Sequence, residues 1–201
     1  MKKILLLLLV LVVVGGTAFA FDINSFPSPI QKGNILISPT FGVGNYYYAG
    51  ATLGLTVAVE YALPINFALT VGGEAGLAFT TSTYLGDYNK PLAIPIMAKA
   101  AWHPNFEVPN LDVYAHMKMG FAIGLLTNKY SDRYSGKSGF CIGFGVGARY
   151  FFSNSIGIFG DVGYENYNVG VKYSSPSGSY YNTSYTYWMR TYLRMGVTFK
   201  I

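Results

Sequence analysis

Ten ionisable side chains recur at alternating positions in runs of residues whose intervening positions hold large apolar side chains. Within each run they share their parity with glycine, alanine and threonine, so the alternation of a β-strand places them all on one face. Acids and bases nearly balance in this set, and the chemistry open to it is ion pairing between neighbouring strands. The residues assigned to this face are Glu60, Glu74, Lys99, His116, Lys118, Arg149, Asp161, Glu165, Arg190 and Arg194.

The two histidines are the candidates for a general base, and neither is placed to activate a nucleophile. His103 directly precedes Pro104 in a predicted turn, and His116 shares its face with Lys118 and has no serine nearby in the sequence. A hydrolytic site needs a nucleophile and a base within hydrogen-bond reach. No group of residues has the spacing of a metal site. We therefore predict no enzymatic activity, no cofactor and no metal.

The run from residue 139 to 152 shows most clearly which element must position these side chains. Phe140, Phe144 and the other bulky residues hold one parity, and the other holds Cys141, Gly143, Gly145, Gly147 and Arg149. A period of two predicts a strand with two unlike faces. The polar turn at 153–155 leads into a second run of the same kind, so the pair predicts a hairpin.

About eight such runs cover the chain from residue 34 to its end. Longer polar connections at 80–90, 128–138 and 173–185 alternate with shorter ones that carry proline or asparagine. In the third run we expect Asn66 to point inward, and Pro95 predicts a bulge or an early end in the fourth. The runs span approximately 34–44, 51–61, 66–79, 92–102, 111–125, 139–152, 156–171 and 187–200.

The first 20 residues have the pattern of a signal peptide. Lys2 and Lys3 precede an apolar stretch at 4–14, and the small residues at 18–20 form a cleavage site. We predict that the signal is removed. The predicted organisation is a signal peptide at 1–20, an N-terminal lead-in at 21–33 and a barrel domain at 34–201.

The composition suits a chain that is exported and then folds into a membrane as strands. Hydrophobic residues make up 51% of the chain and charged residues 11%, a mixture that is hard to keep soluble. The runs with one large apolar face predict a transmembrane β-barrel, with that face toward lipid and the small or ionised face toward a narrow lumen. A soluble secreted β-sandwich is the alternative fold. The net charge is +5, of which Lys2 and Lys3 contribute two, and the remainder is too small to indicate nucleic-acid binding.

Two stretches carry a resemblance to a known family: Gly-Ala-Arg-Tyr-Phe-Phe at 147–152 followed by Gly-Asp-Val-Gly-Tyr-Glu at 160–165, and the alternating C-terminal stretch at 193–201. With them the chain resembles the small outer-membrane β-barrel family (the outer membrane protein β-barrel domain), which includes the OmpA- and OmpX-like eight-stranded barrels. The resemblance implies an up-and-down antiparallel barrel of about eight strands in the outer membrane. It also implies insertion by the barrel-assembly machinery, which reads a last strand that usually ends in an aromatic residue. Here Phe199 is followed by Lys200 and Ile201.

The charged lumen has two interpretations. It is either a permanent salt-bridged filling, as the narrow interior of an eight-stranded barrel favours, or a plug or gate in a narrow pore for small solutes or ions. We favour the filling, because unpaired ions in such a space would cost several kcal/mol each. Asp161 and Glu165 fall in the run next to that of Arg190 and Arg194, and Arg149 falls in the run before, so cross-strand pairs are available.

Tyrosine-rich loops are the candidates for external contacts. Tyr180 and Tyr181 stand in the middle of a loop of serine, asparagine and glycine, a composition typical of protein-binding loops. Tyrosines closer to the strands suit an aromatic girdle. The partners expected are outer-membrane lipid, the assembly machinery and an external protein or cell-surface ligand, with the chain itself a monomer that plays a structural or surface-contact role.

Overall fold

The computed structural model describes residues 26, 27, 29–46, 50–80, 91–126, 134–173 and 188–201, over which the chain forms ten β-strands. No helix in this part of the chain is long and apolar enough to cross a membrane. The strands are β1 (Ile35–Tyr46), β2 (Gly50–Ala62), β3 (Leu69–Thr80), β4 (Pro91–Trp102), β5 (Leu111–Leu126), β6 (Tyr134–Lys137), β7 (Gly139–Phe151), β8 (Ile156–Tyr167), β9 (Gly170–Tyr173) and β10 (Trp188–Lys200).

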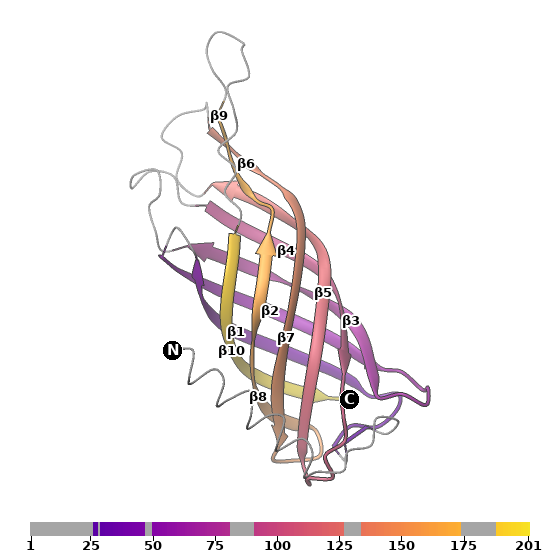
Figure 1. Ribbon diagram of the computed structural model, residues 1–201. Helices are drawn as coiled ribbons and strands as arrows, with labels where there is room; N and C mark the ends of the chain where they lie inside the picture. The colour runs from indigo at the N-terminus through magenta and orange to yellow at the C-terminus, as the bar shows by residue number, and fades with distance from the viewer. Residues whose placement is uncertain (1–25, 28, 47–49, 81–90, 127–133, 174–187) are drawn as a thin grey trace, which may run out of the picture.

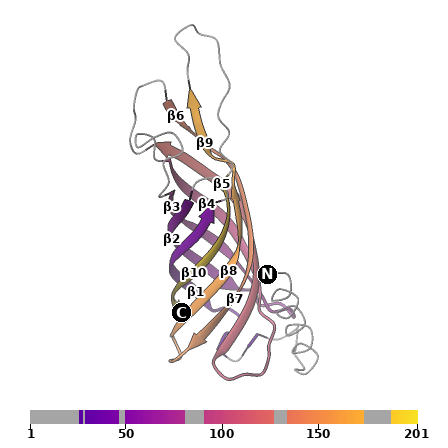
Figure 2. The same cartoon turned by 60° about the vertical axis from the view of Figure 1, so that its left-hand side comes forward.

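Eight of these strands close into one antiparallel barrel in the order β1-β10-β8-β7-β5-β4-β3-β2. Figures 1 and 2 show the strands tilted about a common axis, with the first and last strands side by side. The prediction of an up-and-down barrel of about eight strands is confirmed. The alternative of a β-sandwich is wrong, because a single sheet closes on itself and no second sheet among the described residues packs against its outer face.

The two ends of the barrel differ. At one end β1 begins beside the end of β10, and the connections that follow β2, β4 and β7 lie there too. We call this the turn end, and we call the opposite end, where β1 and β5 finish, the loop end. Ile35, the first residue of β1, and Ile201, which follows β10, are tied together by backbone hydrogen bonds of 2.8 and 2.9 Å.

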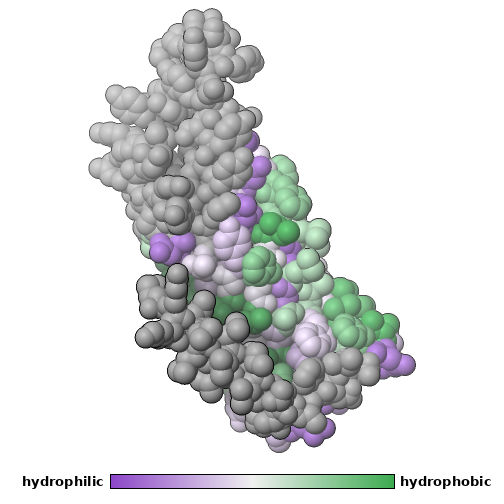
Figure 3. Space-filling model, in the orientation of Figure 1, coloured by the Kyte–Doolittle hydropathy of each residue, from purple (hydrophilic) through white to green (hydrophobic). Residues whose placement is uncertain are grey.

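Side chains alternate between the outside and the inside of the barrel. In β7, Phe140 and Phe144 are 55% and 59% exposed, whereas Cys141 and Arg149 are 0% and 1% exposed. The outward side chains form an apolar wall, along which hydrophobic residues gather in the view of Figure 3. A soluble protein does not leave so large an apolar surface uncovered. Apolar residues therefore lie on the outer face of the barrel and ionised residues on the inner face, as the alternation predicts.

Pro39 and Pro95 lie in the interior of barrel strands without changing the register. Pro95 keeps its place opposite Ala122 on the β5 side, and on the β3 side only two residue pairs are missing from an otherwise constant alignment. The predicted bulge or early end at Pro95 is therefore wrong. Proline removes one donor from one edge of the strand, and the paired opposite edge is enough to keep the strand extended. Pro39 leaves a similar gap toward β10, bridged by the hydroxyls of Ser38 and Thr198 at 2.9 Å.

A short two-stranded sheet, β6 with β9, continues the β7–β8 hairpin beyond the loop end (Figures 1 and 2). Between the pairs Cys141–Tyr167 and Lys137–Gly170, the β6–β7 side spans four residue steps and the β8–β9 side spans three. The β6–β7 side therefore accommodates one extra residue. The prediction that 128–138 is entirely a polar loop is wrong for its last part, which is β6. Its polar residues gave no alternation by which a strand could be recognised.

The described part of the N-terminal lead-in, residues 26, 27 and 29–33, covers the turn end. Phe26 and Ile30 are 9% and 2% exposed. They belong to an apolar cluster, here called the turn-end plug, whose described residues are Phe26, Ile30, Leu36, Ala62, Ala68 and Phe151. Lys200 Nζ donates to the carbonyl oxygen of Pro29 at 2.7 Å, and Gly33 N donates to that of Ala62 at 2.8 Å.

Asn66 lies outside the barrel, contrary to the prediction that it points inward. It is exposed in the turn before β3, and its Oδ1 accepts a hydrogen bond of 3.2 Å from Lys32 Nζ. The strand begins three residues later, at Leu69, because the residues that follow Pro64 form the connection from β2.

Candidate functional site

The structure places eight of the nine residues assigned to the lumen charge network inside the barrel, each at most 6% exposed. The ninth, Arg190, stands opposite Glu165 in the β8–β10 register, and its side chain lies outside the described residues. His116, assigned to the same face, is 5% exposed. The described side chains divide into two clusters at different heights in the lumen.

The first, the turn-end cluster, contains Glu60, Lys99, Asp112 and Arg149. Glu60 Oε1 lies 3.1 Å from Lys99 Nζ and 3.3 Å from an Nη of Arg149. Asp112 Oδ2 lies 2.9 Å from the other Nη of Arg149. Two carboxylates thus share two cations, and each buried charge has the partner that its desolvation requires.

The second, the central cluster, contains Glu74, Lys118, Asp161, Glu165 and Arg194. Arg194 takes Asp161 in a two-pronged contact of 2.9 and 3.1 Å, and it reaches Glu74 across the lumen at 2.7 Å. Lys118 Nζ joins Glu74, at 2.8 Å, to Glu165. Such two-pronged arginine–carboxylate contacts are the strongest of this class. The cluster therefore ties opposite walls of the barrel together.

Aromatic side chains fill the space between the ions. The guanidinium of Arg194 lies 4.3 Å from the ring centre of Tyr192, and that of Arg149 lies 4.9 Å from the ring centre of Tyr114. The hydroxyl of Tyr192 lies 2.9 Å from His116 Nε2. Cations over aromatic faces add to the ion pairing, and these rings occupy lumen volume that water would otherwise fill.

Apolar layers lie beyond both clusters. At the turn end lies the turn-end plug. Toward the loop end lies a second apolar cluster, formed among the described residues by Ala78, Ala93, Met97, Ala122, Cys141, Tyr167 and Val169. Tyr167 also donates from its hydroxyl to Glu165 at 2.7 Å, which joins this layer to the ions. The charges are thus enclosed along the barrel axis as well as by its wall.

Sequence reasoning missed three polar features of the turn-end region. Asp112 has inward parity but was not assigned to the charge network, and it is the residue that pairs with Arg149 in the β5–β7 register. His103, placed in a turn, is 0% exposed and contacts both Asp112 and Thr70. The sequence made Asp161 and Glu165 available as partners of Arg149, but in the structure Arg149 contacts Glu60 and Asp112 instead. Only the parity of Asp112 could have signalled this.

Several predictions fall on residues outside those described. Tyr180 and Tyr181, proposed for external contacts, belong to this group, as does the signal peptide at 1–20. These predictions stay predictions.

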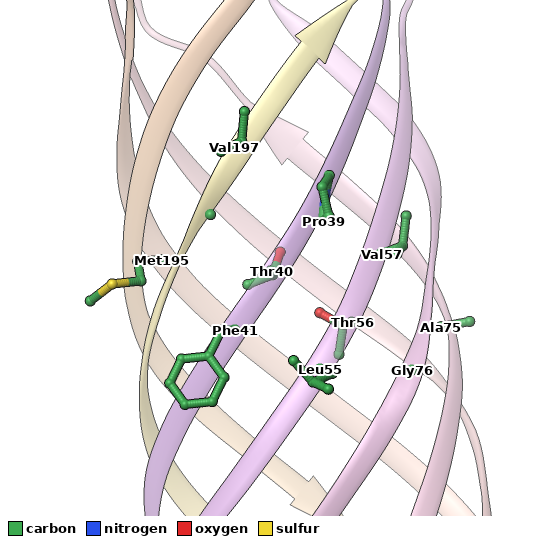
Figure 4. A pocket seen from close by; sticks show the side chains of 11 residues that line it. Pro39, Thr40, Phe41, Leu55, Thr56, Val57, Ala75, Gly76, Met195 and Val197 are labelled. Atoms are coloured by element: carbon green, nitrogen blue, oxygen red, sulfur yellow. The ribbon is translucent and has the colours of Figure 1, made fainter.

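An apolar groove of about 510 Å³ lies on the outside of the wall, where β1, β2, β3 and β10 run side by side. Phe41, Leu55 and Met195 border it, and the smaller Pro39 and Ala75 form part of its lining, as Figure 4 shows. Most of its lining is apolar and outward-facing, and the buried Thr40 and Thr56 also contribute to it.

No protein-family model matches the chain, and no curated protein sequence matches it. Solved structures do match in fold. OprG, an outer membrane protein from Pseudomonas aeruginosa, aligns with a TM-score of 0.60 at 11% identity over 90% of this chain and 99% of that one. Neisserial surface protein A aligns with a TM-score of 0.52 at 11% identity over 84% and 95%. A major outer membrane protein from Thermus thermophilus aligns with a TM-score of 0.50 at 18% identity over 83% and 99%.

These similarities rest on architecture, since so few residues are shared. The closed order of eight antiparallel strands, the outward apolar wall and the matched structures agree with one another. The chain therefore has the fold of the small eight-stranded outer-membrane β-barrels.

Proposed function

We propose that this chain is an integral outer-membrane barrel, without enzymatic activity, whose lumen is permanently closed and whose role is structural or one of surface contact. The observation that carries the closed lumen is the enclosure of two ion-paired clusters between two apolar layers. A conducting path would have to pass side chains whose charges are already neutralised by one another. Breaking those pairs in a narrow, poorly hydrated space costs several kcal/mol for each ion.

The outer membrane is the proposed location. The apolar outer wall suits acyl chains, and the matched OprG is an outer membrane protein. In this location the partners are outer-membrane lipid and, during insertion, the barrel-assembly machinery. Residues 1–20 are removed before insertion. A monomer suffices, because the barrel closes within one chain.

Conductance of purified protein in planar bilayers tests the closed lumen. We expect no steady conductance from the wild-type barrel. Arg190→Ala should lower the stability of the barrel and should likewise give no steady conductance. The alternative is a narrow pore for small solutes or ions, which the charged interior favours. It predicts a steady conductance whose size or ion selectivity changes in Arg190→Ala, and that result would overturn the closed lumen.

Surface contact through the last loop is tested separately. Cells that present Tyr180→Ser/Tyr181→Ser should adhere less to a host-cell or protein-coated surface than cells presenting the wild type. Tyr84→Ser, in a different polar connection, is the matched control. Equal adhesion by all three would contradict a contact role for Tyr180 and Tyr181.

A further inference from the structure

His103 follows β4 at the turn end and has a polar partner on each ring nitrogen. Its Nδ1 lies 2.8 Å from Oδ1 of Asp112 on β5, and its Nε2 lies 3.0 Å from Oγ1 of Thr70 on β3. A neutral imidazole has one donor and one acceptor nitrogen, whereas an imidazolium has two donors. Which protons the two partners require therefore decides the charge of this ring.

The contact with Asp112 requires a proton on Nδ1. The other carboxyl oxygen of Asp112 accepts a hydrogen bond of 2.9 Å from Arg149, and this buried ion pair keeps the carboxyl group ionised. An ionised carboxylate can only accept hydrogen bonds. Nδ1 of His103 is therefore a donor.

The contact with Thr70 requires a proton on Nε2 as well. Thr70 has one hydroxyl proton, and its Oγ1 lies 2.8 Å from Oε2 of Glu60. Glu60 is ionised, because its Oε1 meets Lys99 at 3.1 Å and Arg149 at 3.3 Å. Two acceptors would repel each other at 2.8 Å, so the hydroxyl proton lies between Thr70 and Glu60. Thr70 can then only accept from Nε2.

We infer that His103 is a buried imidazolium that donates to Thr70 and Asp112 and so latches β3, β5 and the turn after β4 together beneath the lead-in. Two aromatic rings flank the cation, Phe26 with its centre at 5.9 Å and Tyr114 with its centre at 5.7 Å. The main-chain nitrogen of His103 also donates to the carbonyl oxygen of Ala68 at 2.8 Å, which holds the backbone that carries the ring against the segment before β3.

The surrounding charges complete the latch. Asp112 faces the ring directly and Glu60 faces it through Thr70, while Lys99 and Arg149 contact these two carboxylates. If Nε2 loses its proton, the single hydroxyl proton of Thr70 must serve either His103 or Glu60 and leaves the other unsatisfied. The latch therefore needs a proton on both ring nitrogens of His103. It does not depend on whether the lumen conducts.

Ring-nitrogen NMR of the folded barrel in detergent micelles tests the charge. The chain contains two histidines, so protein purified without a histidine tag gives two sets of ring signals, and His116→Asn assigns those of His103. At a pH of about 7.5, where a solvent-exposed imidazole with its pKa of about 6.5 is mostly neutral, we expect both His103 ring nitrogens to carry protons. An unprotonated nitrogen on His103 in the wild type would overturn the inference.

Two substitutions of Thr70 sharpen the test. Thr70→Val keeps the shape and removes the acceptor, so His103 should lose its Nε2 proton at the same pH. Thr70→Ser keeps the hydroxyl and should keep both protons. Heat-modifiable migration on a detergent gel establishes that each variant is folded. Full protonation of His103 in a folded Thr70→Val barrel would likewise refute the latch.

Discussion

At the scale of single residues, Arg194 does the most to hold the central cluster together. Its guanidinium contacts Asp161 through two nitrogens and reaches both Glu74 and Glu165. Removing one partner of a buried ionic network leaves the opposite charges buried and unpaired, which is far more costly than removing an exposed ion. The guanidinium of Arg194 therefore stabilises the barrel mainly because it neutralises acids that would otherwise be buried without a partner.

Arg194→Met should lower the free energy of unfolding by roughly 3–5 kcal/mol. Lys32→Met is the control, because it removes a cation from an exposed residue whose partner is the amide of Asn66; its effect should stay within about 0.5 kcal/mol. Urea titration of the barrel in lipid vesicles, followed by tryptophan fluorescence, measures both. Similar effects from the two substitutions would contradict the ionic network.

The inward glycines make room for large lumen side chains. A Cβ on Gly147 would lie 2.5 Å from the Tyr114 ring and 2.7 Å from Asp161 Cβ, whereas one on the outward Gly160 would meet nothing closer than 3.6 Å. Gly147→Ala should therefore destabilise the barrel by about 1–3 kcal/mol. Gly160→Ala should be neutral or stabilise by up to about 1 kcal/mol. The same urea titration measures the free energy of unfolding of both variants. An unchanged free energy of unfolding in Gly147→Ala would show that the lumen beside Gly147 has room for a methyl group.

The sequence predicts which face a residue occupies but not which partner it meets. Alternation placed Glu74 and Arg194 inside, and the hairpin relation brings Arg194 opposite Asp161. Glu74 lies on β3, which is not a neighbour of β10. Contacts across the lumen depend on the closed circumference, which no local pattern records. His103 was missed for a similar reason, because a turn residue has no parity by which to assign it.

At the scale of elements, the lead-in behaves as a closure docked on the completed wall. Its buried residues Phe26 and Ile30 cover the turn end, and its backbone continues the pairing with β2 through Gly33 and Ala62. Its amino-acid pattern predicted only a connection, since two prolines interrupt it and its apolar residues follow no period. Strand existence, by contrast, was predictable wherever large and small residues alternated. Short polar strands such as β6 were not.

Ile30→Ala should loosen this closure while leaving the barrel folded. The buried Ile30 side chain contributes roughly 2–5 kcal/mol by the usual scale for such truncations, and most of this stabilises docking of the lead-in. Hydrogen exchange at the Gly33 amide should therefore become at least about tenfold faster. Ile65→Ala is the matched control, because Ile65 is 43% exposed in the turn after β2. Unchanged exchange in Ile30→Ala would contradict the closure.

At the scale of the whole molecule, the barrel separates an apolar exterior from an ionised interior across a single layer of strands. This arrangement inverts the distribution of apolar and charged residues found in a soluble protein. The stability of the barrel therefore depends on an apolar environment around it. The architecture was predictable because every barrel strand repeats the same two-faced pattern, so that small errors in single strands did not accumulate.

Phe144→Arg and Phe152→Arg test where the apolar solvent lies. Both phenylalanines point outward, at 59% and 61% exposure, but Phe144 lies near the middle of β7 and Phe152 beyond its turn-end limit. In lipid vesicles Phe144→Arg should destabilise the barrel by about 2–4 kcal/mol, and Phe152→Arg by about 0–1 kcal/mol. Equal losses from both would show that the middle of the wall is not embedded in acyl chains.

The bond from Lys200 to the carbonyl oxygen of Pro29 joins the lead-in to β10, and β10 pairs with β1 across the seam that closes the barrel. The lead-in therefore meets this partner in its final place only where the seam between β1 and β10 is paired. Docking of the N-terminal segment and closure of the cylinder are thus thermodynamically coupled, and a change that weakens one should weaken the other.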